Sequence, residues 1–158
     1  MNKGYNNYDK YPFIKAKGKA YQGYDEIRNL IESSQERIIV LDCYPIVDIK
    51  SIVDGLGNLF DEIFYTDTCA YSGEELTAKM QKNLTDDRIF GVMTTAYLSD
   101  YFIDSKIKNM KSAVQNSTGR VLVIGVGAML VWESGFNVHC SLARWESQLR
   151  FRKGAPNW

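Results

Sequence analysis

Hydrophobic residues follow two patterns along this chain: short continuous apolar runs, and apolar residues spaced three and four positions apart. The two patterns follow one another along the sequence and predict alternating strands and helices. Two segments contain apolar runs without interruption, which is typical of strands in a parallel sheet covered on both faces. Two weaker runs follow the spacing of ordinary strands. The predicted strands are 37–43, 61–67, 120–125 and 136–142, the first and third being the strongly apolar ones.

Between the strands, apolar residues recur three and four positions apart, as on one face of a helix. Ile27, Leu30 and Ile31 form such a stripe in the first helix, and Ile107, Met110 and Val114 are expected to face inward in a later one. Helices are predicted at 24–34, 46–59, 74–83 and 143–153, and a longer one is introduced by residues 99–104 and ends near 116. Ser72 is expected to cap the helix at 74–83. In the last helix, Trp145, Leu149 and Arg152 are expected on the inner side. A turn or helix capped by 85–87 is expected through 88–90.

Strands and helices in alternation predict a three-layer α/β sandwich with a mainly parallel sheet. The expected organisation is an N-terminal arm at 1–22, rich in Tyr, Asn, Lys and Gly, and one α/β domain at 23–158. Ligands of such sheets bind at the carboxyl ends of the strands. The segments 43–48, 67–71 and 125–129 should therefore lie along one edge.

Composition narrows the classes of partner. Nineteen basic residues balance nineteen acidic ones, so no overall field favours nucleic acid or an anionic membrane. The longest apolar run, 121–132, is too short to cross a bilayer, and the polar N-terminus lacks the apolar core of a signal peptide. The expectation is a cytoplasmic location, with no nucleic acid or membrane as partner.

The cysteines and the histidine limit metal chemistry. Cys43, Cys69 and Cys140 are widely spaced without a paired motif, which favours buried reduced thiols over zinc ligands or disulfides, with a reactive thiol as the alternative. His139 is the only histidine. A metal centre built from two or three histidines is therefore excluded within this chain.

The octet Tyr44–Ser51 follows the first predicted strand in the position of a phosphate-binding loop. Lys50 and Ser51 match the lysine and hydroxyl of GxxxxGK[ST], but Tyr44 and Ile49 stand where that pattern needs glycines. Pro45 also removes one backbone donor. The pattern indicates a phosphate site that has lost its chemistry, and the plain alternative is that Lys50 and Ser51 are surface residues of a helix.

Two further groups of residues are candidates for binding. Asp42 and Asp67 are expected to end adjacent strands and could hold magnesium, although carboxylates there also cap turns. Arg144 and Arg150 could bind an anion through their guanidinium groups, whereas Glu146 lies at helical spacing from Arg150 and favours a surface ion pair.

Two other features have a binding interpretation and a structural one. Gly125-Val126-Gly127 after the second apolar strand is typical either of a dinucleotide loop or of a tight turn. Aromatic residues gather near both termini, and a contact with another domain or subunit is favoured over base stacking because no basic groove accompanies them. They include Tyr5, Tyr8, Tyr11, Tyr21, Tyr24, Trp132, Trp145, Phe151 and Trp158.

Three segments, YDKYPFIKAKGKAYQGYDEI at 8–27, DDRIFGVM at 86–93 and ARWESQLRFRKGAPNW at 143–158, carry a family likeness. They resemble the N-terminal domain of the long bacterial form of class I mannose-6-phosphate isomerase. The resemblance implies a P-loop-kinase-like fold with a degenerate nucleotide loop. It also implies that the zinc-dependent isomerase chemistry resides in a cupin domain that this chain does not contain, so no zinc ligand, catalytic residue or other cofactor is expected here.

The functional expectation is a non-catalytic domain of a mannose-6-phosphate isomerase-like protein, involved in packing, oligomerisation or regulation in carbohydrate metabolism. Its expected partners are an attached or associated cupin isomerase domain and further copies of itself. The alternative is a kinase-like domain that binds a nucleotide through Lys50, Ser51, Asp42 and Asp67, or a sugar phosphate through Arg144 or Arg150.

Overall fold

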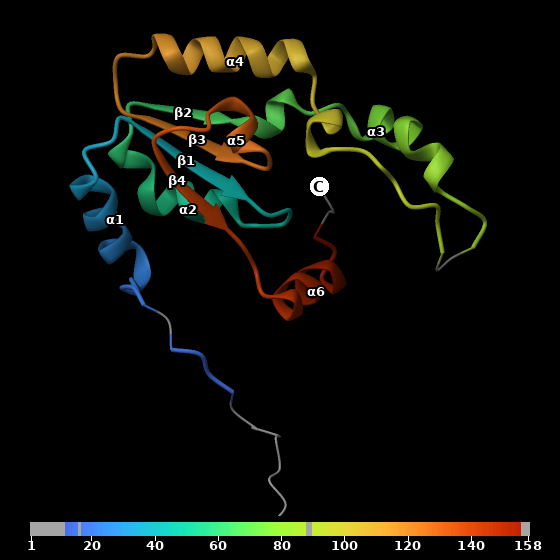
Figure 1. The fold of residues 1–158 in the computed structure, drawn as a ribbon, viewed down its shortest axis with the longest axis horizontal. Coiled ribbons are helices and arrows are strands. Elements are labelled where there is room, and N and C mark those ends of the chain that lie inside the picture. The colour runs from blue at the N-terminus through green and yellow to red at the C-terminus, as the bar shows by residue number, and fades with distance from the viewer. Residues whose placement is uncertain (1–11, 16, 88–89, 156–158) are drawn as a thin grey trace, which may run out of the picture.

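The computed structural model describes residues 12–15, 17–87 and 90–155. Within these residues four strands form one parallel sheet in the order β2-β3-β1-β4 (Figure 1). The two strands with continuous apolar runs are the inner pair, so the prediction that such runs mark covered strands is confirmed. The strands are β1 (Ile38–Cys43), β2 (Glu62–Tyr65), β3 (Val121–Gly125) and β4 (Phe136–Cys140).

Helices connect the strands and cover both faces of the sheet. The helices are α1 (Gly23–Ser33), α2 (Ile49–Leu56), α3 (Gly73–Met80), α4 (Asp104–Asn116), α5 (Ala128–Val131) and α6 (Arg144–Arg152), and 3-10 turns lie at Gly57–Leu59, Thr66–Cys69, Gln81–Asn83 and Leu98–Tyr101. Figure 1 shows α4 on one side of the sheet and α1 and α2 on the other. The chain is a three-layer α/β sandwich, as predicted.

Two apolar cores separate these layers. Ile39, Leu41, Leu122 and Ile124 pack beneath α1 and α2 on one face. On the opposite face, Val40, Val121 and Val123 pack against α4 and α5, where Ile107, Met110 and Val114 point inward as predicted. Alternate residues of the same strands thus enter different cores, which explains the uninterrupted apolar runs of the inner strands, 38–41 in β1 and 121–124 in β3.

Capping determines where two of the helices begin. Ser72 accepts a hydrogen bond from the Glu75 amide, and the Glu75 carboxylate accepts one from the Ser72 amide, a capping box that confirms Ser72 as the cap of α3. Helix α2 starts at Ile49, three residues later than predicted. Ile46 has a left-handed backbone with φ of 66°, so the helical conformation cannot extend through it.

The last two helices differ from the prediction. Helix α5 was not predicted, because its single turn is too short to display a periodic pattern. In α6, Trp145 was expected to face inward but is 61% exposed, and Arg152 lies over its ring at 5.6 Å. Ser147 is the buried residue of α6, so the placement of Trp145 and Arg152 on an inner face was wrong.

Part of the predicted N-terminal arm lies outside the described residues, including Tyr5, Tyr8 and Tyr11. The described stretch before α1 leaves the domain as an extended chain (Figure 1), and Phe13 and Ile14 are exposed there. The predicted turn or helix through 88–90 includes two residues that are not described, and Trp158 is likewise outside. No helix of the described chain is long and apolar enough to cross a membrane.

The buried centre of the sheet should dominate stability. Leu122 is fully buried in β3, so Leu122→Ala is expected to lower the free energy of unfolding by about 2–5 kcal/mol through lost burial and the cavity left behind. Leu84→Ala is the matched control, because Leu84 is 56% exposed and should change it by less than about 0.5 kcal/mol. Chemical denaturation measures both, and equal losses would contradict the assignment of this core.

Candidate functional site

A cavity of about 480 Å³ opens at the carboxyl edge of the sheet, and we call it the sheet-edge crevice. It is lined by Tyr44, Ile46, Val47, Asp48, Ile49, Asp67, Val126, Arg150 and Ala155. These residues come from the loops after β1, β2 and β3, from the start of α2, and from α6 and the segment after it. A neighbouring, mostly apolar cavity of about 770 Å³ shares Asp67 and Val126 with it. The predicted alignment of three loop segments along one edge is therefore confirmed.

The topology explains why the crevice lies at this point. Helix α2, which follows β1, packs on one face of the sheet, and α5, which follows β3, packs on the other. Because β1 and β3 are neighbours, the chain leaves adjacent strand ends in opposite directions and a gap remains between the two loops. This is the position where open parallel sheets bind their ligands.

The loop between β1 and α2 is held from both sides. The Tyr44 amide donates to the Cys140 carbonyl of β4 at 2.8 Å. Arg150 Nη1 donates to the carbonyl of Ile46 at 2.9 Å, while Arg150 Nε donates to Glu146 Oε1 at 2.8 Å. The Arg150 guanidinium thus supports the loop at its left-handed residue and is paired with an acid of its own helix.

A carboxylate of the protein itself occupies the N-terminus of α2. Asp48 Oδ1 accepts a hydrogen bond from the Ser51 amide at 3.0 Å, so Asp48 is the N-cap of the helix. In a phosphate-binding loop, the helix N-terminus and its free amides are the part that receives the anion. Here that position already contains a negative charge.

The two residues that match the phosphate-loop pattern have partners elsewhere. Lys50 Nζ pairs with Asp54 Oδ2 at 2.5 Å, and its side chain is 85% exposed. The hydrogen bond to Asp54 raises the pKa of Lys50 above its ordinary value. Ser51 Oγ shares a hydrogen bond with the Tyr24 hydroxyl at 3.0 Å. Neither residue lines the crevice.

The two aspartates proposed for magnesium do not end adjacent strands, so that expectation was wrong. Strand β3 lies between β1 and β2, which separates Asp42 from Asp67. Asp42 accepts from the Met129 amide at 3.4 Å and lies 3.9 Å from His139 Nδ1, whereas Asp67 lines the crevice. Among the residues that the structure describes, no group of three or more His, Cys, Asp or Glu is arranged to hold a metal ion.

The glycines after β3 form a tight turn. Gly125 has φ of 131°, and a Cβ there would collide with the Thr66 hydroxyl. That hydroxyl is fully buried and donates to the Val126 carbonyl at 2.8 Å. A Cβ on Gly127, whose φ is 71°, would lie 2.9 Å from the Phe102 ring. Close packing and positive φ therefore account for both glycines, in agreement with the turn interpretation.

The two candidate anion-binding arginines belong to different cavities. Arg150 lines the sheet-edge crevice, whereas Arg144 lines a separate cavity of about 510 Å³ together with Tyr44, Ser141, Gln148 and Phe151. The two guanidinium groups therefore do not converge on one anion. Arg150 also forms the predicted ion pair with Glu146.

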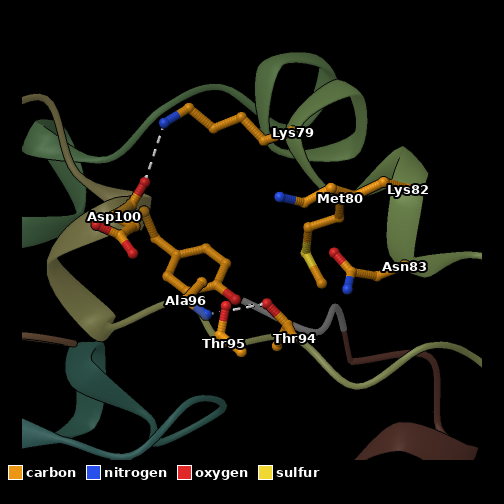
Figure 2. Close-up of a pocket in the computed structure, with 9 residues that line it drawn as sticks. Lys79, Met80, Lys82, Asn83, Thr94, Thr95, Ala96 and Asp100 are labelled. Atoms are coloured by element: carbon orange, nitrogen blue, oxygen red, sulfur yellow. Dashed lines mark hydrogen bonds between the residues drawn. The ribbon is translucent and has the colours of Figure 1, made fainter.

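A small polar cavity that sequence reasoning missed lies beyond α3 (Figure 2). Its volume is about 270 Å³, and Lys79, Lys82, Asn83, Thr94 and Thr95 supply polar lining. Lys79 Nζ donates to the Asp100 carbonyl at 3.1 Å and lies 3.9 Å from the centre of the Tyr71 ring. Lys79 is therefore engaged in holding the α3 segment to the chain around Asp100.

Fold and crevice together define this protein as a three-layer α/β domain with a crevice at the carboxyl edge of its sheet and an aspartate that caps the helix after β1. The chain belongs to the family DUF8485, described as a domain of unknown function, whose family model matches residues 23–158. No curated protein matches the chain, and no solved structure does.

The role of Asp48 as the cap of α2 can be tested with one variant that removes its hydrogen bond and another that removes only its charge. Asp48→Ala removes the acceptor for the Ser51 amide and is expected to lower the free energy of unfolding by about 1 kcal/mol. Asp48→Asn keeps an equally good cap and should retain most of the stability. Asp54→Ala, on the same helix, breaks only an exposed ion pair and should have little effect. A loss in denaturation experiments as large for Asp54→Ala as for Asp48→Ala would contradict this role of Asp48.

Proposed function

We propose that this domain is non-catalytic and acts through contact with another protein, on a kinase-like scaffold whose phosphate loop no longer binds phosphate. The observation that carries the proposal is the Asp48 carboxylate at the N-terminus of α2. A phosphate at this helix N-terminus would have to approach the Ser51 amide, which Asp48 already engages. The proposal thus depends on competition between the Asp48 carboxylate and a free phosphate for the N-terminus of α2.

The charge of Asp48 also opposes an incoming phosphate directly. Two like unit charges 4 Å apart repel by about 1 kcal/mol in bulk water and by about 4 kcal/mol near a protein surface. This corresponds to a loss of affinity between about 5-fold and about 1000-fold. Lys50 offers little compensation, because its ammonium group pairs with Asp54 outside the crevice.

The partner that we propose is a mannose-6-phosphate isomerase-like enzyme. Support comes from the resemblance of 8–27, 86–93 and 143–158 to the N-terminal domain of the long bacterial isomerases. The zinc-dependent interconversion of mannose 6-phosphate and fructose 6-phosphate would reside in the cupin domain of that partner, so the zinc would be held there. Exposed aromatic residues of α6, Trp145 and Phe151, offer apolar area for such a contact.

A second candidate function is the binding of a sugar phosphate beside α6. The observation that favours it is the cavity in which Arg144 lies with the hydroxyls of Ser141 and Ser147 and the amide of Gln148. A guanidinium group and neutral hydrogen-bonding side chains are suitable partners for a phosphate.

Titration calorimetry separates lost phosphate chemistry from both binding alternatives. With magnesium and ATP, no saturable heat is expected up to millimolar ligand, because Asp48 caps the N-terminus of α2. With mannose 6-phosphate none is expected either, because Arg144 and Arg150 line different cavities and do not converge on one anion. Sub-millimolar ATP binding that disappears in Lys50→Ala would refute the loss of phosphate chemistry. Binding of mannose 6-phosphate that disappears in Arg144→Ala would establish the second candidate instead.

The partner is tested by analytical ultracentrifugation with the cupin domain of a long bacterial isomerase. A complex at micromolar concentrations is expected, and the chain alone should not isomerise mannose 6-phosphate. A short-form isomerase, which has no appended domain, is the control and should not bind. Sedimentation of the chain and the long-form cupin domain as separate species would count against the proposed partner, and the same runs report whether the chain forms oligomers.

A further inference from the structure

Two of the three cysteines lie side by side at the carboxyl end of the sheet. Cys43 ends β1 and Cys140 ends β4, and the two residues are directly paired in the parallel register. Side chains of directly paired residues project from the same face of a sheet. Both thiols belong to the core between the sheet and helices α1 and α2, and both cysteines are free.

This arrangement matches the separation that a disulfide requires. Neighbouring strands lie about 4.7–4.9 Å apart, and the Cα atoms of bonded cysteines are usually about 4.4–6.8 Å apart. The strands are also anchored at this point, because the Tyr44 amide next to Cys43 donates to the Cys140 carbonyl at 2.8 Å. The Cα separation expected for this pair therefore lies within the range that a disulfide spans.

The two thiols differ in access. Cys43 is 3% exposed, whereas Cys140 is half-buried and lines a groove of about 350 Å³ between α1, α2 and β4. The groove is apolar, with Ile27, Ile52 and Val138 among its lining residues. A small reagent of low charge thus reaches Cys140 before Cys43.

The two thiols also differ in acidity, and the more accessible thiol, that of Cys140, is the more acidic one. Interaction with the Cys43 thiol lowers the pKa of Cys140. The pKa of Cys43 is raised, first by its interaction with Cys140 and then by burial. Since the thiolate is the attacking form, the accessible Cys140 is suited to react first and the buried Cys43 to react second.

We propose that Cys43 and Cys140 form a redox-active dithiol that is oxidised by small organic disulfides of low charge. The Cys140 thiolate attacks one sulfur of the reagent, whose S–S bond breaks and releases one small thiolate. Cys43 then loses its proton to solvent and attacks the Cys140 sulfur, which releases the second small thiolate. The two cysteines are oxidised by two electrons, and the reagent is reduced to two thiols.

The site of this modification adjoins the sheet-edge crevice without overlapping the residues assigned to phosphate recognition. Cys43 directly precedes Tyr44, which lines the crevice, so the new bond would lie at the start of the loop between β1 and α2. The inference does not depend on the proposed function, because it requires only the register of β1 with β4 and the apolar groove.

The test is oxidation of the full chain by 2-hydroxyethyl disulfide, followed by thiol titration under denaturing conditions and peptide mapping. The three thiols should fall to one, with loss of two hydrogens and a peptide pair that joins Cys43 to Cys140. Cys43→Ser should stop at a stable mixed disulfide on Cys140. Cys69→Ser is the control and should still form the bond, because Cys69 lies in a separate core cluster and burial raises its pKa.

Three results would overturn the inference: three thiols retained by the wild-type chain, a bond that includes Cys69, or an adduct of Cys43→Ser found on Cys69 in place of Cys140. Peptide mapping of the wild-type chain decides the first two whether or not the serine variants fold.

Discussion

Strands β1 and β3 pair in parallel over five residues of each, from Ile38 with Val121 to Asp42 with Gly125, and every residue of β3 is buried. Both faces of this pair need a cover of helices, since neither face can be left to water. Helix α2 therefore passes to one face and α5 to the other. The sheet-edge crevice is the space left where these two chain paths diverge, so its position follows from the central pairing.

The same pairing explains why the polar groups of the loop after β1 are hydrogen-bonded within the protein. The loop connects a largely buried strand to a helix that packs in the same core as Leu122 and Ile124, and its polar groups have to be satisfied within a short span. Asp48 accepts from the Ser51 amide, the Cys140 carbonyl accepts from the Tyr44 amide, and Arg150 donates to the Ile46 carbonyl. These three contacts define the loop in the absence of any ligand.

Much of the fold could be predicted because it depends on local pattern. The uninterrupted apolar runs identified β1 and β3, and Ser72 identified the start of α3. Strand order could not be predicted, because it is determined by packing between distant segments. This is why Asp42 and Asp67 were wrongly expected on adjacent strands, and why the neighbouring positions of Cys43 and Cys140 were not foreseen.

The hydrophobic pattern also could not predict which side of α6 faces the rest of the domain. Its aromatic residues suggested an inner face, yet the helix contacts the domain through Ser147 and Arg150, and Trp145 remains outside. An apolar pattern predicts that a side chain will be buried, but it does not identify the surface that will cover that side chain. In α6 the available surface is the loop after β1, whose carbonyl at Ile46 accepts a hydrogen bond from the Arg150 guanidinium.

The two positions at which the phosphate-loop pattern requires glycine are occupied by Tyr44 and Ile49. Ile49 packs against the core of the α1 and α2 face, so a glycine there would remove apolar burial and weaken the start of α2. The Tyr44 side chain lines two cavities, and the Asp48 charge would still oppose phosphate after both glycines were restored. Ile49 and Asp48, two of the residues that depart from the phosphate-loop pattern, contribute to packing and to the cap of α2, so the stability of the domain depends on the sequence of this loop as it stands.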